Sequence, residues 1–295
     1  MLDFLIIGAQ KSASTYVHKC LEEHPEVTMP NGEVTVFEDP DYQSNGPDLL
    51  KDMYKSNYAS QIKKGIKRPD YLAKKECAQR IFAHSPKAKL IITLRNPLDR
   101  AISAYFHYMR MGLLTIKPLN VGMESILKGE NQEPKGMDVI SYGFYYEQIQ
   151  NYLYYFDRNQ ILILFDDEIR LDPLSSMRKV YRFLEIDEFY SPKNINSKAN
   201  IGVYNLKRLY CYRFISKLIY KYNEDNTRLF KRTNIISRAI SKAFNSIDRF
   251  ILANLFKESK PSLDSTIKNK LIETYTTDTD NLEIMLNKDL SNWKS

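Results

Sequence analysis

Long hydrophobic runs are missing from this sequence of 295 residues. None approaches the roughly 18–20 apolar residues of a membrane-spanning helix. The start, MLDFLIIGAQ, also lacks the basic segment and the small-residue cleavage site of a secretory signal. The 3 cysteines, Cys20, Cys77 and Cys211, are odd in number and have no metal-like spacing. We therefore expect a cytoplasmic protein with reduced thiols that requires no metal.

Excess positive charge is absent from the first two thirds of the chain. Residues 1–195 contain 25 Lys and Arg against 26 Asp and Glu, whereas residues 196–270 contain 16 against 5. The net charge of +7 therefore belongs to one later segment. A highly phosphorylated ligand bound by the first part would need individually placed cations.

Apolar runs and helical patterns alternate along the first 200 residues. FLIIG, KLIITLRNP and QILILFDDEI are typical of buried strands, and amphipathic stretches lie between them. This alternation predicts an α/β fold in which helices flank a central parallel sheet. A long loop is expected over residues 29–48. The later segments predict a helical C-terminal extension, with a core at 1–203, basic helices at 204–261, and a last helix and tail at 262–295 packing back on the core.

The stretch FLIIGAQKSAST has the form of a strand, a turn and a helix N-terminus. Free N–H groups and a partial positive charge at such a helix start bind phosphate, and Lys11 adds a full charge. The stretch lacks the second glycine of the nucleotide P-loop and is not a dinucleotide fingerprint. Taken alone, it fits a phosphate site or a polar turn. Its candidate ligands are Lys11, Ser12, Ala13, Ser14 and Thr15.

The stretch KLIITLRNPLDRAISAYFHY places Arg95 at the end of another buried strand and Ser103 on the following helix. A charge at a strand end is costly unless it meets an anion. A guanidinium and a hydroxyl would suit a second phosphate. The alternative is an ion pair between Arg95 and Asp99, with Ser103 packing on the sheet.

These two motifs resemble those of sulfotransferases that use 3′-phosphoadenosine 5′-phosphosulfate (PAPS), in the branch shared by bacterial and heparan-sulfate-type enzymes. QKSAST is similar to the family's phosphosulfate loop, P-K-S-G-T-T, and RNPLDRAISAY fits the family's 3′-phosphate motif. DTDNLEIMLNKDLSNW resembles the family's ending. Two departures are Ala13 where the family has glycine and Gln10 where it has proline. The resemblance implies a P-loop-like sulfotransferase fold with PAPS as donor and adenosine 3′,5′-bisphosphate as product.

The resemblance also implies catalytic roles in an in-line transfer. Lys11 would stabilise the leaving phosphate, Glu33 in NGEVTVFEDPDY would be the general base, and Lys67 in GIKRPDYL would approach the transferring group. Competitors for the base are Glu38, Asp39 and His107. Lys198 and Asn200 would close over the adenosine and its 3′-phosphate. Expected acceptor contacts are Phe37, Glu38, Arg68, Tyr71 and His107.

The sequence says least about the molecule that accepts the sulfuryl group. Acidic Glu33, Glu38, Asp39, Asp41 and Asp48 lie within sixteen residues without a Lys or Arg, which favours a neutral or cationic small polar molecule over a polysaccharide. The basic segment 204–261 is interpreted as a lid, a membrane contact, a glycan contact or packed helices with solvated lysines. A protein of another class, binding nucleotide or RNA without catalysis, would show salt-sensitive binding. No specific nucleic-acid partner is expected, and oligomerisation stays open.

Overall fold

The computed structural model describes residues 1–54, 62–193, 195–196, 202–223, 228–232, 234–256 and 260–295. The chain forms two compact units. Unit 1 contains residues 1–96, 144–200 and 278–289, and unit 2 contains residues 97–143, 201–277 and 290–295. This division differs from the predicted boundaries at 203 and 261, because the helix after residue 96 packs with the helix after residue 205. No helix in the described part of the chain is both long and apolar enough to cross a bilayer.

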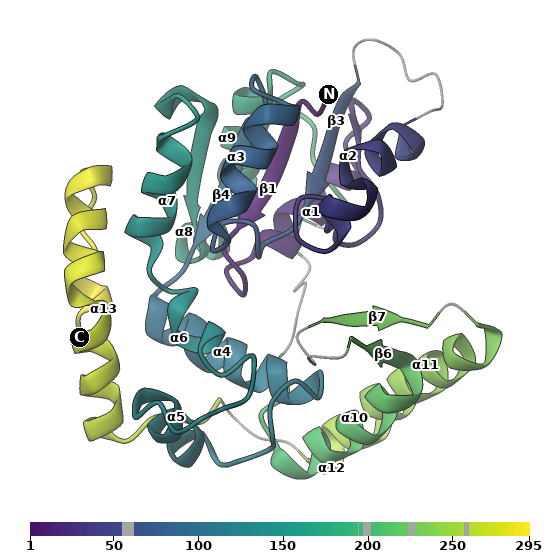
Figure 1. The fold of residues 1–295 in the computed structure, drawn as a ribbon, viewed down its shortest axis with the longest axis vertical. Helices are drawn as coiled ribbons and strands as arrows, with labels where there is room; N and C mark the ends of the chain where they lie inside the picture. The colour runs from purple at the N-terminus through teal and green to yellow at the C-terminus, as the bar shows by residue number, and fades with distance from the viewer. Residues whose placement is uncertain (55–61, 194, 197–201, 224–227, 233, 257–259) are drawn as a thin grey trace. The chain divides into compact units, whose positions relative to one another are not determined.

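Unit 1 is built on a five-stranded parallel sheet in the order β2-β3-β1-β4-β5 (Figure 1). In that order the strands span Val27–Thr28, Lys63–Lys67, Phe4–Gly8, Lys89–Leu94 and Ile161–Phe165. The predicted parallel sheet with FLIIG at its centre is confirmed. Parallel strands are buried on both faces, which explains the continuous apolar runs of β1 and β4.

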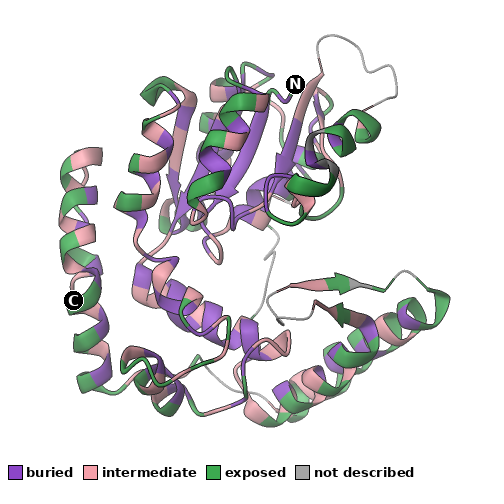
Figure 2. Ribbon diagram, in the orientation of Figure 1, coloured by how far each residue is buried: buried purple, intermediate pink, exposed green. Residues whose placement is uncertain are grey.

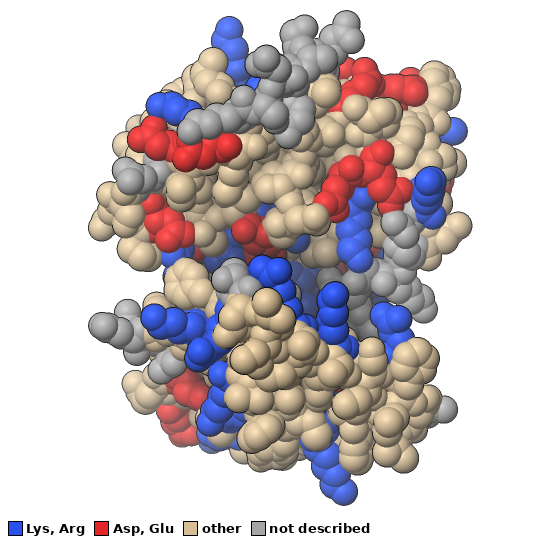
Figure 3. All heavy atoms as spheres, turned by 90° about the vertical axis from the view of Figure 1, so that its right-hand side faces the viewer, with Lys and Arg blue, Asp and Glu red and all other residues tan. Residues whose placement is uncertain are grey.

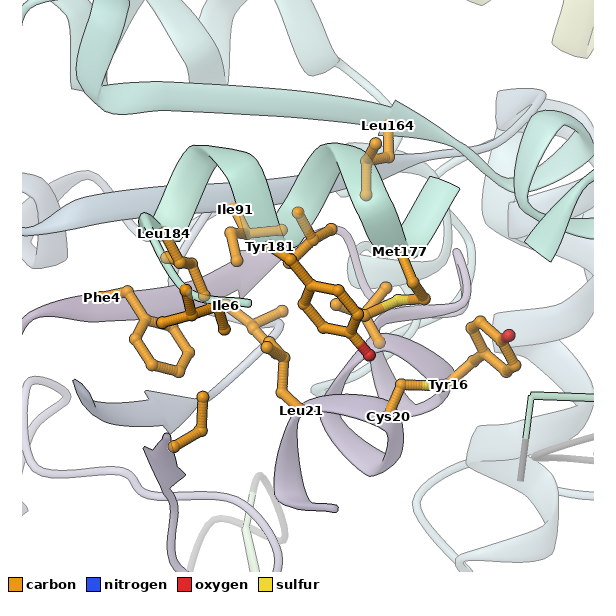
Figure 4. Close-up of a cluster of buried hydrophobic side chains, with 14 of the residues drawn as sticks. Phe4, Ile6, Tyr16, Cys20, Leu21, Ile91, Leu164, Met177, Tyr181 and Leu184 are labelled. Carbon is orange, nitrogen blue, oxygen red and sulfur yellow. The ribbon is translucent and has the colours of Figure 1, made fainter. Parts of the chain in front are cut away.

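Helices cover both faces of the sheet. On one face, α1 (Ser14–Glu22), α8 (Asp166–Leu171) and α9 (Pro173–Leu184) enclose the core of Figure 4, where Phe4 and Ile6 cluster with Tyr181. On the other face lie α3 (Lys75–His84) and α7 (Tyr145–Leu153), which contact each other. Figure 2 shows the central strands almost wholly buried.

The three cysteines are free thiols. Cys20 and Cys77 are buried in unit 1, and Cys211 is half-buried in unit 2. Burial raises the pKa of the Cys20 thiol to about 11, so it stays protonated and packs as a small apolar side chain.

Two elements of unit 1 differ from the sequence expectation. β3 was not predicted, because its sequence KKGIK has no apolar run. The predicted loop 29–48 is interrupted by α2 (Asp41–Met53). A Cβ at Gly46 would lie 2.0 Å from the carbonyl oxygen of Val36, so this glycine allows close packing of a helix instead of forming a turn.

Unit 2 is mostly helical, which confirms the predicted helical C-terminal part. Its elements are α4 (Pro97–Arg110), α5 (Leu119–Leu127), α6 (Asp138–Ser141), α10 (Leu206–Ile219), the hairpin of β6 (Tyr220–Tyr222) and β7 (Leu229–Lys231), α11 (Ile235–Ile247), the π-helical turn η2 (Asp248–Leu252), α12 (Ala253–Leu255) and η3 (Ser291–Trp293). Tyr222, whose spacing predicted a helix, lies on β6 instead and donates to the carbonyl oxygen of Met111 at 2.8 Å.

The last long helix, α13, spans Ser265–Leu286, within the segment 262–295 where a last helix and tail were expected. Its final turns belong to unit 1. There the Asp278 carboxylate accepts hydrogen bonds from the backbone N–H groups of Tyr146 (3.0 Å) and Glu147 (3.3 Å). Lys288 lies 2.6 Å from Glu168. These polar contacts hold the tail residues against α7 and α8.

Candidate active site

The predicted phosphate loop connects the central strand β1 to α1, as expected from its sequence. Residues Ala9–Ala13 form the turn, and α1 begins at Ser14. No side chain caps the first turn of α1. The N–H groups of Tyr16 and Val17 donate to the carbonyl oxygen of Ala13, and the end of the helix before them can face an anion. Lys11 and Thr15 are partly exposed beside it.

Backbone strain is concentrated in this loop. Lys11 has φ of 68° and Ala13 has φ of 70°, both in the left-handed region. Ala13 is the position where the resembling family has glycine, which adopts this conformation without a steric penalty. For alanine, the left-handed conformation costs roughly 1–2 kcal/mol. The loop therefore keeps the glycine-type geometry and bears the strain.

The loop also contains buried polar atoms without a partner. The hydroxyl of Ser12 is fully buried, and neither it nor the side-chain oxygen of Gln10 has a hydrogen-bond partner. Buried polar atoms are rarely left unsatisfied unless a ligand or water uses them. An uncapped helix start and an orphaned hydroxyl are groups that an anion such as phosphate or sulfate fits.

Lys67 joins the loop to the predicted general base. Its ammonium nitrogen lies 3.2 Å from the Thr15 hydroxyl and 3.5 Å from Oε1 of Glu33. The side chain is only 5% exposed, because Lys67 is the last residue of β3, next to the central strand. Three residues that are far apart in the sequence thus meet at one point. A buried ammonium there requires an anionic neighbour.

Glu33 lies at the accessible edge of this group. Its side chain is 37% exposed, and Oε2 accepts a hydrogen bond of 2.7 Å from Arg68. The loop that carries it is bonded to β3, since the Val34 N–H donates to the carbonyl oxygen of Lys67 at 3.0 Å. Two cations therefore contact an exposed carboxylate, a group whose oxygens can accept a proton.

Glu38 is the buried anchor of the same network. It is fully buried and paired with Arg68 and with Lys74, the latter at 2.7 Å. Burial raises the pKa of its carboxyl, but the hydrogen bonds and charges of Arg68 and Lys74 outweigh burial and lower the pKa to about 2. Arg68 also contacts Asp70 at 3.0 Å. Arg68 thus connects a buried carboxylate to the exposed one of Glu33.

Three of the expected acceptor contacts lie in the interior. Phe37, Glu38 and Tyr71 are each fully buried. The Tyr71 hydroxyl donates to the carbonyl oxygen of Val34 and accepts from the Phe37 N–H at 3.3 Å. In this arrangement they fix the loop that carries Glu33 and present no surface to an acceptor.

Most acidic side chains of residues 33–48 are paired with Lys or Arg side chains. Asp39 pairs with Arg80 of α3 at 2.8 Å, Asp48 pairs with Lys51 at 2.8 Å, and Asp41 accepts a hydrogen bond from Thr35. Glu33 and Glu38 pair with cations of the 67–74 segment, as described above. Four of the five acids therefore pair with cations, which come from residues 67–80 and, for Asp48, from Lys51 of the same helix.

His18 is a neighbour of the site that no sequence motif indicated. It lies on α1, one turn after Ser14, and its Nε2 is 3.2 Å from the carbonyl oxygen of Pro30. Burial, and then the charge of Lys67, lower the pKa of the imidazole to about 4. A neutral His18 therefore connects α1 to the loop that precedes Glu33.

Arg95 follows β4 at the same edge of the sheet. Its Nε lies 3.5 Å from Oδ2 of Asp166, and its carbonyl oxygen accepts a hydrogen bond of 2.9 Å from Tyr145. Ser103 and His107 lie on α4 and belong to unit 2. Lys198 and Asn200 lie outside the described residues. The described residues contain no group of three or more His, Cys, Asp or Glu that could hold a metal ion.

Parts of this chain are similar to known proteins. A curated relative, the bifunctional heparan sulfate N-deacetylase/N-sulfotransferase 2 of Bos taurus, is 31% identical over 198 residues, which are 63% of this chain and 22% of that protein. Heparan sulfate glucosamine 3-O-sulfotransferase 5 of Mus musculus is 25% identical over 69% of this chain and 59% of its own length. The chain thus spans about a fifth to three fifths of these relatives.

A solved structure has the same fold over the whole chain. The sulfotransferase from Alicyclobacillus acidocaldarius superimposes with a TM-score of 0.68 at 19% identity, covering 100% of this chain and 99% of that one. The family described as "Sulfotransferase domain" matches residues 2–235. The chain therefore belongs to the sulfotransferase domain family.

Proposed function

We propose that this protein transfers a sulfuryl group from PAPS to a hydroxyl or amine of a glycan. The observation that carries the proposal is the position of Lys67, which lies between Thr15 of the donor loop and Glu33. Membership of the sulfotransferase family supports the reaction, and PAPS is the cosubstrate that the family implies.

The donor would be held by backbone and side-chain groups of the loop at the start of α1. Lys11, Ser12, Ser14, Thr15 and the N–H of Ala13 would bind the phosphosulfate, and the orphaned Ser12 hydroxyl supports this assignment. Arg95, with Ser103, Lys198 and Asn200, is proposed for the 3′-phosphate. PAPS, when bound, would supply the sulfuryl group, and adenosine 3′,5′-bisphosphate would be the leaving group. No metal enters this proposal.

The proton of the acceptor would move to a carboxylate oxygen of Glu33. The acceptor oxygen or nitrogen forms its bond to sulfur while the sulfur–oxygen bond to the leaving phosphate breaks. Lys11 would stabilise the charge that develops on that phosphate, and Lys67 would contact the transferring group. Glu38, Phe37 and Tyr71 would support this step by holding Arg68 and the Glu33 loop in place.

The glycan acceptor replaces the small polar acceptor that the acidic loop predicted. That expectation depended on uncompensated negative charge, and Asp39, Asp48 and Glu38 are instead paired with cations. The names of the relatives, heparan sulfate N- and 3-O-sulfotransferases, support a saccharide carrying amines and hydroxyls. A small polar alcohol or amine is the alternative acceptor.

One set of measurements tests the reaction. Glu33→Gln is expected to lower kcat about 100-fold, as removal of a general base does, while calorimetric binding of adenosine 3′,5′-bisphosphate stays unchanged. Glu124→Gln, which removes an exposed carboxylate paired with Lys128 at 2.8 Å, is the matched control and should leave both values unchanged. Arg95→Ala should weaken bisphosphate binding by about 1.5–3 kcal/mol, and equal affinity for AMP would refute a 3′-phosphate pocket.

The acceptor is tested with labelled donor against three classes of compound. We expect transfer to an N-desulfated, glucosamine-containing polysaccharide and little transfer to neutral or cationic small alcohols and amines. More transfer to small alcohols and amines than to the polysaccharide would favour the small-molecule alternative. Salt-sensitive RNA binding without any sulfate transfer would favour the non-catalytic class.

A further inference from the structure

The helices of residues 206–256 in unit 2 carry an exposed apolar face that the proposed reaction does not use. Tyr210, Phe214 and Leu218 follow one another at intervals of four along α10 and therefore share one side of it. They are 58%, 69% and 44% exposed. Large apolar side chains rarely gather on a surface unless it contacts another apolar phase.

The same face continues across the next helices. A groove of about 460 Å³ is lined by Tyr210 and Phe214 of α10, by Ile247 of α11 and by Leu252 of η2. Other exposed apolar side chains of this helical pair are Ile235, Ile236, Phe250, Ile251 and Leu255. Residues of α10, α11, η2 and α12 thus form this face together.

Cations border this apolar face. Arg238, Lys242 and Arg249 are exposed, and their spacings of four and seven residues place them in one row along α11 and η2. On α10, exposed Lys207 and Lys217 lie three residues before Tyr210 and three after Phe214. In Figure 3, blue Lys and Arg side chains border a broad tan area of unit 2 in the lower part of the view.

Positive charge outweighs negative charge in this segment. Residues 206–256 contain eleven Lys and Arg against three acidic residues, Glu224, Asp225 and Asp248. Asp248 is buried, and its carboxylate contacts the Arg208 guanidinium and the Tyr212 hydroxyl, each at 2.6 Å. The acid therefore holds α10 to η2 and exposes no charge to repel an anionic partner.

We propose that this face, formed by α10, α11, η2 and α12, docks the protein on the surface of an anionic phospholipid bilayer. Apolar side chains would enter the boundary between headgroups and acyl chains, while the flanking Lys and Arg contact lipid phosphates. Since no described helix can cross a bilayer, this contact is peripheral.

Charge and apolarity together select a lipid surface over the two other occupants. A second copy of the chain, paired symmetrically, would place the cation row against its own equivalent, and like charges repel. An anionic glycan would satisfy the cations but would leave Phe214 and Phe250 without an apolar partner. Only an anionic bilayer matches both.

Vesicle flotation tests the docking without any sulfate transfer, so its outcome is independent of the proposed reaction. The full chain should float with vesicles of phosphatidylcholine mixed with phosphatidylglycerol, and at least tenfold less with phosphatidylcholine alone. Phe214→Ser and, separately, Phe250→Ser should each lower the partition coefficient roughly tenfold. Phe189→Ser is the matched control, because Phe189 is 78% exposed in unit 1, and it should leave the partition unchanged.

Charge variants complete the test. Arg238→Gln and Lys242→Gln should each lower the partition about fivefold at low salt, with a smaller effect at high salt. Thermal melts confirm that each variant folds. The proposal is overturned by equal binding to both vesicle types, or by equal effects of Phe214→Ser and Phe189→Ser. It is also overturned if Phe214→Ser instead abolishes a dimer, or if only a sulfated glycan is bound.

Discussion

Glu38→Gln is the substitution that most sharply tests the network around the candidate active site. Glu38 is fully buried and paired with Arg68 and Lys74. Glutamine keeps the size of the side chain but removes its charge, so two cations lose a buried partner. Breaking a buried ion pair from one side is strongly destabilising.

The pKa of Glu38 sets the size of the effect. It falls from 4.5 to about 2, because the hydrogen bonds and charges of Arg68 and Lys74 outweigh the opposing effect of burial. This difference between the unfolded and folded states corresponds to about 3 kcal/mol of the free energy of unfolding. Since the folded-state pKa is the lower one, this stability is fully present above pH 4.5 and is lost as the pH falls towards 2. At pH 3.5 about three fifths of it should remain.

Urea unfolding of wild type and variant at pH 7, 4.5 and 3.5 measures the difference. Glu185→Gln is the control, because Glu185 makes a comparable 2.8 Å pair with Lys89 but its side chain is 72% exposed. For Glu185→Gln we expect the free energy of unfolding to fall by less than about 0.5 kcal/mol. Equal losses for the two variants, or a Glu38→Gln difference that does not shrink with acid, would refute the reasoning.

Two further results are expected. Ala13→Gly should raise the free energy of unfolding by about 0.5–1 kcal/mol, because relief of the left-handed strain at φ of 70° exceeds the entropy cost of glycine. Urea unfolding measures this free energy, and a decrease would show that the strain is absent. His18→Gln should flatten the fall in stability between pH 6.5 and 4. The folded-state pKa of about 4 lies below the ordinary histidine pKa of 6.5, so acid protonates the unfolded chain first. An unchanged pH profile in urea unfolding would contradict this role of His18.

Elements with a local sequence signal could be predicted before the fold was known. FLIIG and KLIITL are continuous apolar runs and became β1 and β4. Asp172 followed by Pro173 is typical of a helix start, and at the start of α9 the Asp172 side chain accepts from the Ser175 N–H at 3.0 Å. The phosphate loop could be predicted in the same way, because a strand, a turn and a helix start follow one another within twelve residues.

The tertiary structure alone decided which charges meet. Lys67 belongs to a strand without an apolar run, and its contacts to Thr15 and Glu33 span 52 and 34 positions of the sequence. The acidic loop seemed to lack compensation because Arg80 and Lys74, which neutralise it, come from later segments. Local periodicity reports which face of an element is apolar. The burial and pairing of a charge depend on neighbours that only the folded chain brings within a few ångströms.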